Sequence, residues 1–161
     1  MTPARIRRLS LTLLTALSML AAVTVHAQLA AWDQERVTAA AHDFSQSAGK
    51  VYSELYRNQV TYTIGSGQSK DYQRLRDKVR VIRSEARRLT RQLEKGKGRD
   101  ATLPIYERMM VDVRDAREIA RRLNLGEALL NKIGAAGDAL RRLGPYYDPK
   151  ANQNPEAPAS E

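Results

Sequence analysis

The chain has 161 residues and carries 27 basic and 18 acidic side chains, a formal net charge of +9. It contains no cysteine, which excludes disulfide frameworks, thiol catalysis, a lipid-modified cysteine and the covalent attachment motif of c-type haem. The length suffices for one domain with a hydrophobic core and is too short to suggest two.

Residues 1–27 have the layout of a secretory signal peptide. A basic start is followed by an apolar run over residues 9–25, and small residues at Val25 and Ala27 end it. We expect a Sec-type signal cleaved after Ala27, because the paired arginines lack the polar residue that usually precedes a twin-arginine motif. The alternative is an uncleaved anchor, since a 17-residue helix reaches about 25 Å. The predicted location is periplasmic or secreted, in a bacterium.

Four stretches of the mature chain carry apolar residues at alternating steps of four and three. This spacing places one narrow apolar stripe on each of four helices. The stripe residues are Val37, Ala41, Phe44, Ala48, Val51 and Leu55; Tyr72, Leu75, Val79, Ile82, Ala86, Leu89 and Leu93; Tyr106, Met109, Val113, Ala116, Ala120 and Leu123; and Leu129, Ile133, Ala136, Leu140 and Leu143. The pattern predicts an all-α, antiparallel up-and-down bundle over residues 28–145, with three long helices and one shorter one.

The segment between the first two stretches is "NQVTYTIGSGQS", residues 58–69, which is longer than a helix corner requires. Its apolar side chains alternate with polar ones before two glycines. We expect this loop to cover the end of the bundle or to contact a partner, with Tyr62 and Ile64 as candidate contact residues.

Capping residues, prolines and glycines indicate features of the later helices. Asp100 or Thr102 is the predicted cap of the third helix, with Pro104 in its first turn. Gly134 and Gly137 in the fourth helix favour close approach of a neighbouring helix, with a bend as the alternative. The Pro- and Ala-rich tail over residues 146–161 is expected to be disordered.

Candidate catalytic groups are few, so we do not expect an enzyme. His42, the single histidine after the signal, lies beside the apolar stripe on a position that should face water. Asp112 and Asp115 lie among arginines and are explained by ion pairs on the helix surface. A haem carrier would need His42 with Met109 or Met110, but Met109 lies on the apolar stripe, where core packing is its expected role. No cofactor and no metal site are expected.

Residues 70–99 hold 12 basic and 4 acidic side chains and so carry most of the charge. One row of this helix, which we call the arginine ridge, contains Arg76, Arg80, Arg83, Arg87 and Arg91. Carboxylates of neighbouring helices would neutralise the ridge under one interpretation, and an anionic partner would bind it under the other. Nucleic acid is not expected in an exported protein whose basic helix lacks interleaved aromatic residues.

The sequence therefore favours a non-enzymatic binding or adaptor protein that engages an anionic envelope component or an acidic protein, with membrane contact at most peripheral. One alternative is a carrier for haem, metal or a small apolar molecule. Another is a periplasmic chaperone or inhibitor. Oligomeric state is left open by the stripes of Ala, Val and Leu.

Overall fold

A computed structural model describes residues 29–57 and 67–153, and all regular structure within them is helical. The helices are α1 (Gln34–Arg57), α2 (Gly67–Glu94), α3 (Arg99–Ala120) and α4 (Glu127–Leu143), followed by the short 3-10 helices η2 (Gly144–Tyr146) and η3 (Pro149–Gln153). The prediction of an all-α chain with three long helices and one shorter helix is confirmed. None of the described helices combines the length and the apolar character needed to cross a membrane. The predicted signal peptide and the loop residues Tyr62 and Ile64 lie outside the described ranges.

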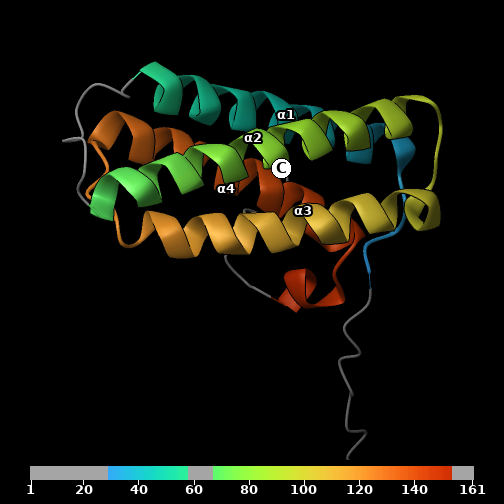
Figure 1. The fold of residues 1–161 in the computed structure, drawn as a ribbon. Coiled ribbons are helices and arrows are strands. Elements are labelled where there is room, and N and C mark those ends of the chain that lie inside the picture. The colour runs from blue at the N-terminus through green and yellow to red at the C-terminus, as the bar shows by residue number, and fades with distance from the viewer. Residues whose placement is uncertain (1–28, 58–66, 154–161) are drawn as a thin grey trace, which may run out of the picture.

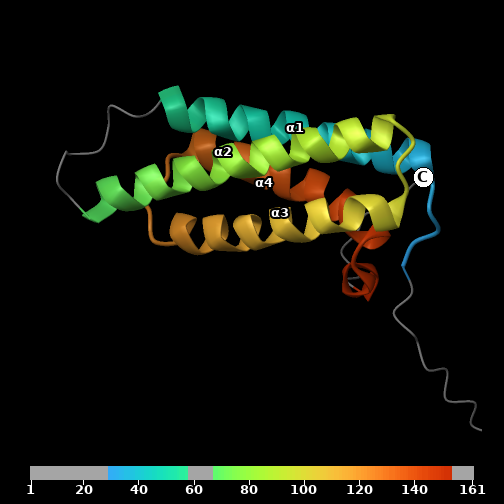
Figure 2. The same cartoon turned by 45° about the vertical axis from the view of Figure 1, so that its right-hand side comes forward.

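The four helices lie side by side in a bundle-like arrangement, with α2 in front and α4 behind (Figure 1, and turned by 45° in Figure 2). α2 packs against both α1 and α3, and α1 packs against α4 as well. The side chain of Gln34 donates a 2.7 Å hydrogen bond to the carbonyl of Leu93, which joins the start of α1 to the end of α2. Tyr72 Oη donates to the carbonyl of Leu55 at 2.7 Å and joins the opposite ends of the same two helices.

The apolar stripes form the core, as the spacing predicts. Every stripe residue of α1 and α2 is buried, from Val37 to Leu55 and from Tyr72 to Leu93. The stripe of α4 is covered less completely, as the partial burial of Ile133 and Ala136 shows. The reason is that α3 and α4 make few close backbone contacts with each other.

The glycines of α4 do not admit a neighbouring helix. A Cβ atom added at Gly134 would meet no atom within 4 Å, and one at Gly137 would meet only the tip of Arg141, at 3.9 Å. The expectation of close helix approach at these positions is therefore wrong. The missing side chains instead leave open space beside α4.

α3 begins two residues earlier than a cap at Asp100 predicts and four residues earlier than a cap at Thr102 predicts. Gly98 is the N-cap and no side chain caps the helix, so the prediction of Asp100 or Thr102 as the cap is wrong, and Pro104 lies inside the helix. Thr102 is fully buried, donates to the carbonyl of Gly98 at 2.9 Å and shares a 2.8 Å hydrogen bond with Tyr147 Oη. Tertiary packing of Thr102 thus outweighs the local capping signal.

The segment after α4 folds back onto the helices. Tyr147 is 6% exposed, and its ring stacks on Tyr106 at a centroid distance of 4.4 Å and meets Trp32 edge-on at 5.6 Å. The backbone N–H of Ala30 donates to the carbonyl of Pro145 at 2.9 Å, which ties the start of the described chain to this segment. The expectation of a disordered tail from residue 146 is wrong for residues 146–153, while residues 154–161 lie outside the described part.

Candidate functional site

The flank of α2 that faces α3 is neutralised by acidic side chains. Lys78 Nζ lies 2.8 Å from a carboxylate oxygen of Asp112 and 2.8 Å from one of Asp115. These hydrogen bonds raise the pKa of Lys78, and the bond from Lys78 lowers the pKa of Asp115. Glu85 of α2 lies 4.0 Å from Arg108 of α3. Pairing with a neighbouring helix therefore accounts for the charge on this flank.

The arginine ridge lacks such partners. Arg80 lies 3.7 Å from Asp77 in an exposed pair on the same helix, an arrangement that contributes about 0–1 kcal/mol. No carboxylate of residues 29–57 or 67–153 lies within 4.0 Å of the other four guanidinium groups, those of Arg76, Arg83, Arg87 and Arg91.

Two ridge residues line a surface cleft of about 600 Å³ that runs along α1. The cleft also receives side chains from α1 and α4, and five of the lining side chains are cationic whereas one is a carboxylate. We call it the basic cleft; its cations are Lys50, Arg57, Arg83, Arg87 and Lys132. Cations gathered in one concave surface raise the local positive potential more than the same charges spread over a convex face.

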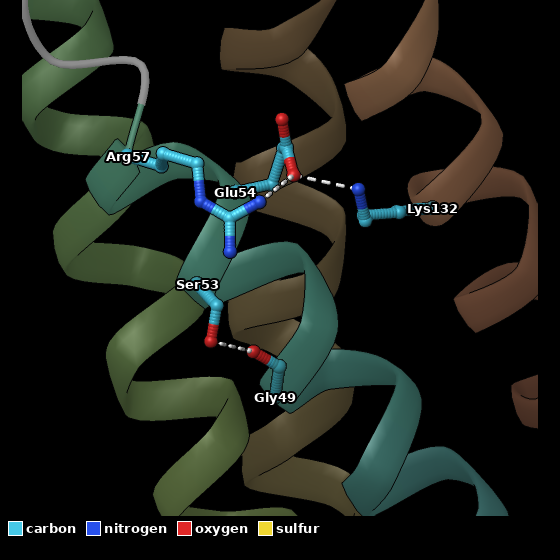
Figure 3. A network of polar contacts seen from close by, with 5 residues as sticks. All are labelled: Gly49, Ser53, Glu54, Arg57 and Lys132. Atoms are coloured by element: carbon cyan, nitrogen blue, oxygen red, sulfur yellow. Dashed lines mark hydrogen bonds and ion pairs between the residues drawn. The ribbon is translucent and has the colours of Figure 1, made fainter.

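Small residues of α1 form the floor of the basic cleft. Ser45, Gly49 and Ser53 follow one another at steps of four and therefore share one helix face. A Cβ atom added at Gly49 would lie 4.0 Å from Arg83 Nε, so the arginine passes directly over this part of α1. Ser53 Oγ donates to the carbonyl of Gly49 at 2.9 Å, which keeps the hydroxyl against the helix (Figure 3).

Arg83 is positioned by an aromatic ring. Its Cζ atom lies 5.0 Å from the ring centroid of Tyr52, a cation–π distance, and its Nε is buried without a hydrogen-bond partner among the described residues. Arg87 follows one turn later on the same face and is exposed. Within the part of the chain that the structure describes, neither guanidinium group has a carboxylate within 4.0 Å.

Glu54 is the single carboxylate of the basic cleft and links α1 to α4. Its side chain is 10% exposed, and Oε2 lies 2.6 Å from Lys132 Nζ and 3.9 Å from Arg57 Nη1 (Figure 3). Glu54 therefore pairs with two of the five cations. Among the described residues, the other three, Lys50, Arg83 and Arg87, have no carboxylate within 4.0 Å.

The basic cleft includes part of the predicted ridge and adds cations that sequence reasoning missed. Arg83 and Arg87 belong to it, whereas the other three ridge residues are not among its lining. Lys50 and Arg57 are seven residues apart on α1, a spacing that signals a shared helix face. No comparable signal points to Lys132, because its place depends on how α4 packs against α1.

The remaining candidates of the sequence do not come together. His42 is exposed at the edge of the basic cleft, whereas Met109 is fully buried in the core and Met110 is partly buried. Within the described part of the chain no group of three or more His, Cys, Asp or Glu side chains is arranged to hold a metal ion.

No protein-family model matches the chain, and neither the curated proteins nor the solved structures include a significant match to it. The function is therefore inferred from the residues themselves.

Proposed function

We propose that this chain is an exported, non-enzymatic binding or adaptor protein that uses its basic second helix to engage an anionic component of the cell envelope or an acidic partner protein. The observation that carries the proposal is that Arg83 and Arg87 lie together in the basic cleft and that no carboxylate of residues 29–57 or 67–153 lies within 4.0 Å of either guanidinium group. Guanidinium groups bind phosphate and carboxylate oxygens through paired N–H donors. The ligand class is therefore a phosphorylated, sulfated or carboxylated surface.

The proposal includes an antiparallel up-and-down order of the helices and an N-terminal signal peptide. Contacts that join the start of one helix to the end of the next support the helix order, among them the hydrogen bond from Gln34 to Leu93 and the ion pair of Arg122 with Asp71 at 3.4 Å. This order brings Lys50, Arg83 and Lys132 to one surface from three helices. The basic start, apolar run and small-residue end of residues 1–27 support export.

Binding to heparin and to vesicles of anionic phospholipid tests the role of the basic cleft. The double variant Arg83→Gln with Arg87→Gln is expected to elute from heparin at lower salt and to bind vesicles about 10- to 30-fold more weakly, since each basic residue near an anionic surface contributes about 1 kcal/mol. Arg114→Gln with Arg121→Gln is the matched control, because it removes the same charge from two exposed positions, one on α3 and one at its C-cap.

Comparison of the two double variants distinguishes binding at the basic cleft from attraction by the net charge of the protein. If both lose affinity equally, net charge alone attracts the anion and the basic cleft is not the site. If neither loses affinity, anion binding does not involve these arginines at all. An acidic protein as the partner would show itself by salt-sensitive capture from periplasmic extract that depends on the same pair.

Export has a separate test. Expression with the native leader, followed by fractionation and intact mass measurement, is expected to yield periplasmic or secreted protein that begins at Gln28. A mass that includes residues 1–27 would contradict cleavage after Ala27 and favour the retained anchor.

A further inference from the structure

The basic cleft contains more positive charge than its own carboxylate balances. Five cations line it, and Glu54 pairs with two of them. In the described part of the chain, the remaining three have no carboxylate within 4.0 Å; they are Lys50, Arg83 and Arg87. Three unbalanced cations in one concave surface favour an anion that carries more than a single negative charge.

These three cations enter the cleft from two helices. Arg83 and Arg87 lie four residues apart on α2, so their Cβ atoms are about 5–6 Å apart and both side chains can reach the same anion. Lys50 belongs to α1 and directly follows Gly49, the residue over which Arg83 lies. Donors from two helices are not confined to one plane. A tetrahedral anion therefore suits the cleft better than a planar carboxylate.

The contact of Arg83 with Tyr52 leaves the donors of the guanidinium group available. The Cζ atom lies over the ring at 5.0 Å from its centroid, and a cation–π contact of this kind uses the face of the guanidinium. The N–H groups lie in the guanidinium plane and point away from that contact. Arg83 Nε is buried and has no hydrogen-bond partner among the described residues, a state that a bound ion would relieve.

The floor of the cleft has room for a group rich in oxygen atoms. Gly49 has no side chain, and a Cβ atom added there would meet only Arg83 Nε, at 4.0 Å. Ser45 and Ser53 lie one turn away on either side of Gly49 on the same face of α1, and Figure 3 shows Ser53 beside Gly49. An anion can therefore approach α1 here without meeting a bulky side chain.

We infer that the basic cleft binds a phosphomonoester, whose terminal phosphate accepts hydrogen bonds from Arg83 and Arg87 of α2 and from Lys50 of α1. The inference rests on the proposed function and narrows its ligand class. A phosphomonoester carries a charge of about −1.5 to −2 at pH 7 and has three terminal oxygens that accept hydrogen bonds. A phosphodiester, a sulfate ester and a carboxylate each carry a single charge. Soluble esters and membrane lipids both present the phosphomonoester group.

Vesicle binding tests whether the cleft prefers this group. One set of vesicles contains phosphatidic acid, a phosphomonoester, and the other contains phosphatidylglycerol, a phosphodiester, in the proportion that gives both sets the same zeta potential. The full mature chain is expected to bind the phosphatidic acid vesicles about tenfold more tightly, the effect of roughly one additional charge-assisted hydrogen bond. Equal binding to the two sets would overturn the inference.

Calorimetric titration with methyl phosphate distinguishes a soluble ester from a lipid. Saturable one-to-one binding supports the inference and identifies a soluble phosphomonoester as sufficient. Preference for phosphatidic acid vesicles without binding of methyl phosphate also supports it and identifies a lipid head group as the ligand. Methyl sulfate has the same shape and one charge fewer, so binding of methyl sulfate as tight as that of methyl phosphate would overturn the inference.

Two variants change the cleft and keep all of its positive charge. Arg87→Lys removes the planar fork of N–H donors, and Gly49→Leu fills the floor. Each is expected to reduce the preference for phosphatidic acid at least threefold and to bind phosphatidylglycerol like the wild type. Gly134→Leu is the matched control, because it lies outside the cleft lining and a Cβ atom there would meet no atom within 4 Å. Circular dichroism establishes that each variant is folded.

Failure of this inference and failure of the proposed function give different results. Wild-type preference for phosphatidic acid in both Arg87→Lys and Gly49→Leu would overturn the inference alone. So would equal binding of the wild type to both vesicle sets, provided that Arg83→Gln with Arg87→Gln weakens binding to each. If that double variant binds both sets like the wild type, the proposed function fails together with the inference.

Discussion

Replacement of Tyr147 measures how much the segment after α4 contributes to stability. The ring is 6% exposed, stacks on Tyr106 at 4.4 Å and meets Trp32 edge-on. Truncation of a buried aromatic side chain to alanine costs about 3–5 kcal/mol, and we expect Tyr147→Ala to lie in this range. Tyr147→Phe should cost only about 1 kcal/mol, because Thr102 loses the 2.8 Å bond to the phenol but keeps its bond to the carbonyl of Gly98.

Urea unfolding followed by circular dichroism at 222 nm gives the free energy of unfolding of each variant. Tyr56→Ala is the matched control, since Tyr56 is 60% exposed and its loss should change stability by less than about 0.5 kcal/mol. A chain that ends after Pro145 should lose at least as much stability as Tyr147→Ala. If that truncation and Tyr147→Ala both leave the free energy of unfolding unchanged, the docking of residues 146–153 is wrong.

Three further predictions use the same urea assay, two at this end of the molecule and one within α4. Burial raises the pKa of Tyr106 to about 12, so its contribution to stability is complete below the unfolded pKa of about 10 and is lost as pH rises from 10 through 12. Between pH 9 and pH 11 the wild type should lose about 1.3 kcal/mol more than Tyr106→Phe in urea unfolding, and parallel losses would contradict this burial. Gly144→Ala should destabilise the protein by about 1–2 kcal/mol in the same assay, because the added Cβ would lie 3.0 Å from Ala151 Cβ. Gly134→Ala, where the added methyl meets open space, should instead stabilise it by up to about 1 kcal/mol, and a loss of stability there would contradict the open surface of α4.

Helix positions were predictable because their signal is local. The alternating steps of four and three identify residues that share one helix face, and the stripe residues of α1 and α2 are buried accordingly. Errors arose where tertiary contacts override local signals. Thr102 was expected to cap α3 but is buried beneath Tyr147, and the tail that looked polar and aperiodic is held by Tyr147 itself.

The candidate site was predictable only in part. The row that contains Arg83 and Arg87 follows from helix geometry, since both belong to one face of α2. The aromatic contact of Arg83 with Tyr52 and the position of Lys132 do not follow from it, because each depends on the distance between two helices. The open space beside Gly134 of α4 was not expected, since the glycines of α4 suggested close packing.

The sequence by itself determined the four α-helices of the described residues, the apolar face of each helix, and the concentration of positive charge on the second one. These properties depend on spacing along the chain, because each residue of an α-helix adds a fixed rise and a fixed rotation. Tertiary structure alone decided that Lys78 contacts two carboxylates whereas Arg83 and Arg87 contact none among the described residues, and that α3 and α4 make few close contacts. Ion pairs and cavities depend on separations of a few ångströms between elements, which no pattern within one helix encodes.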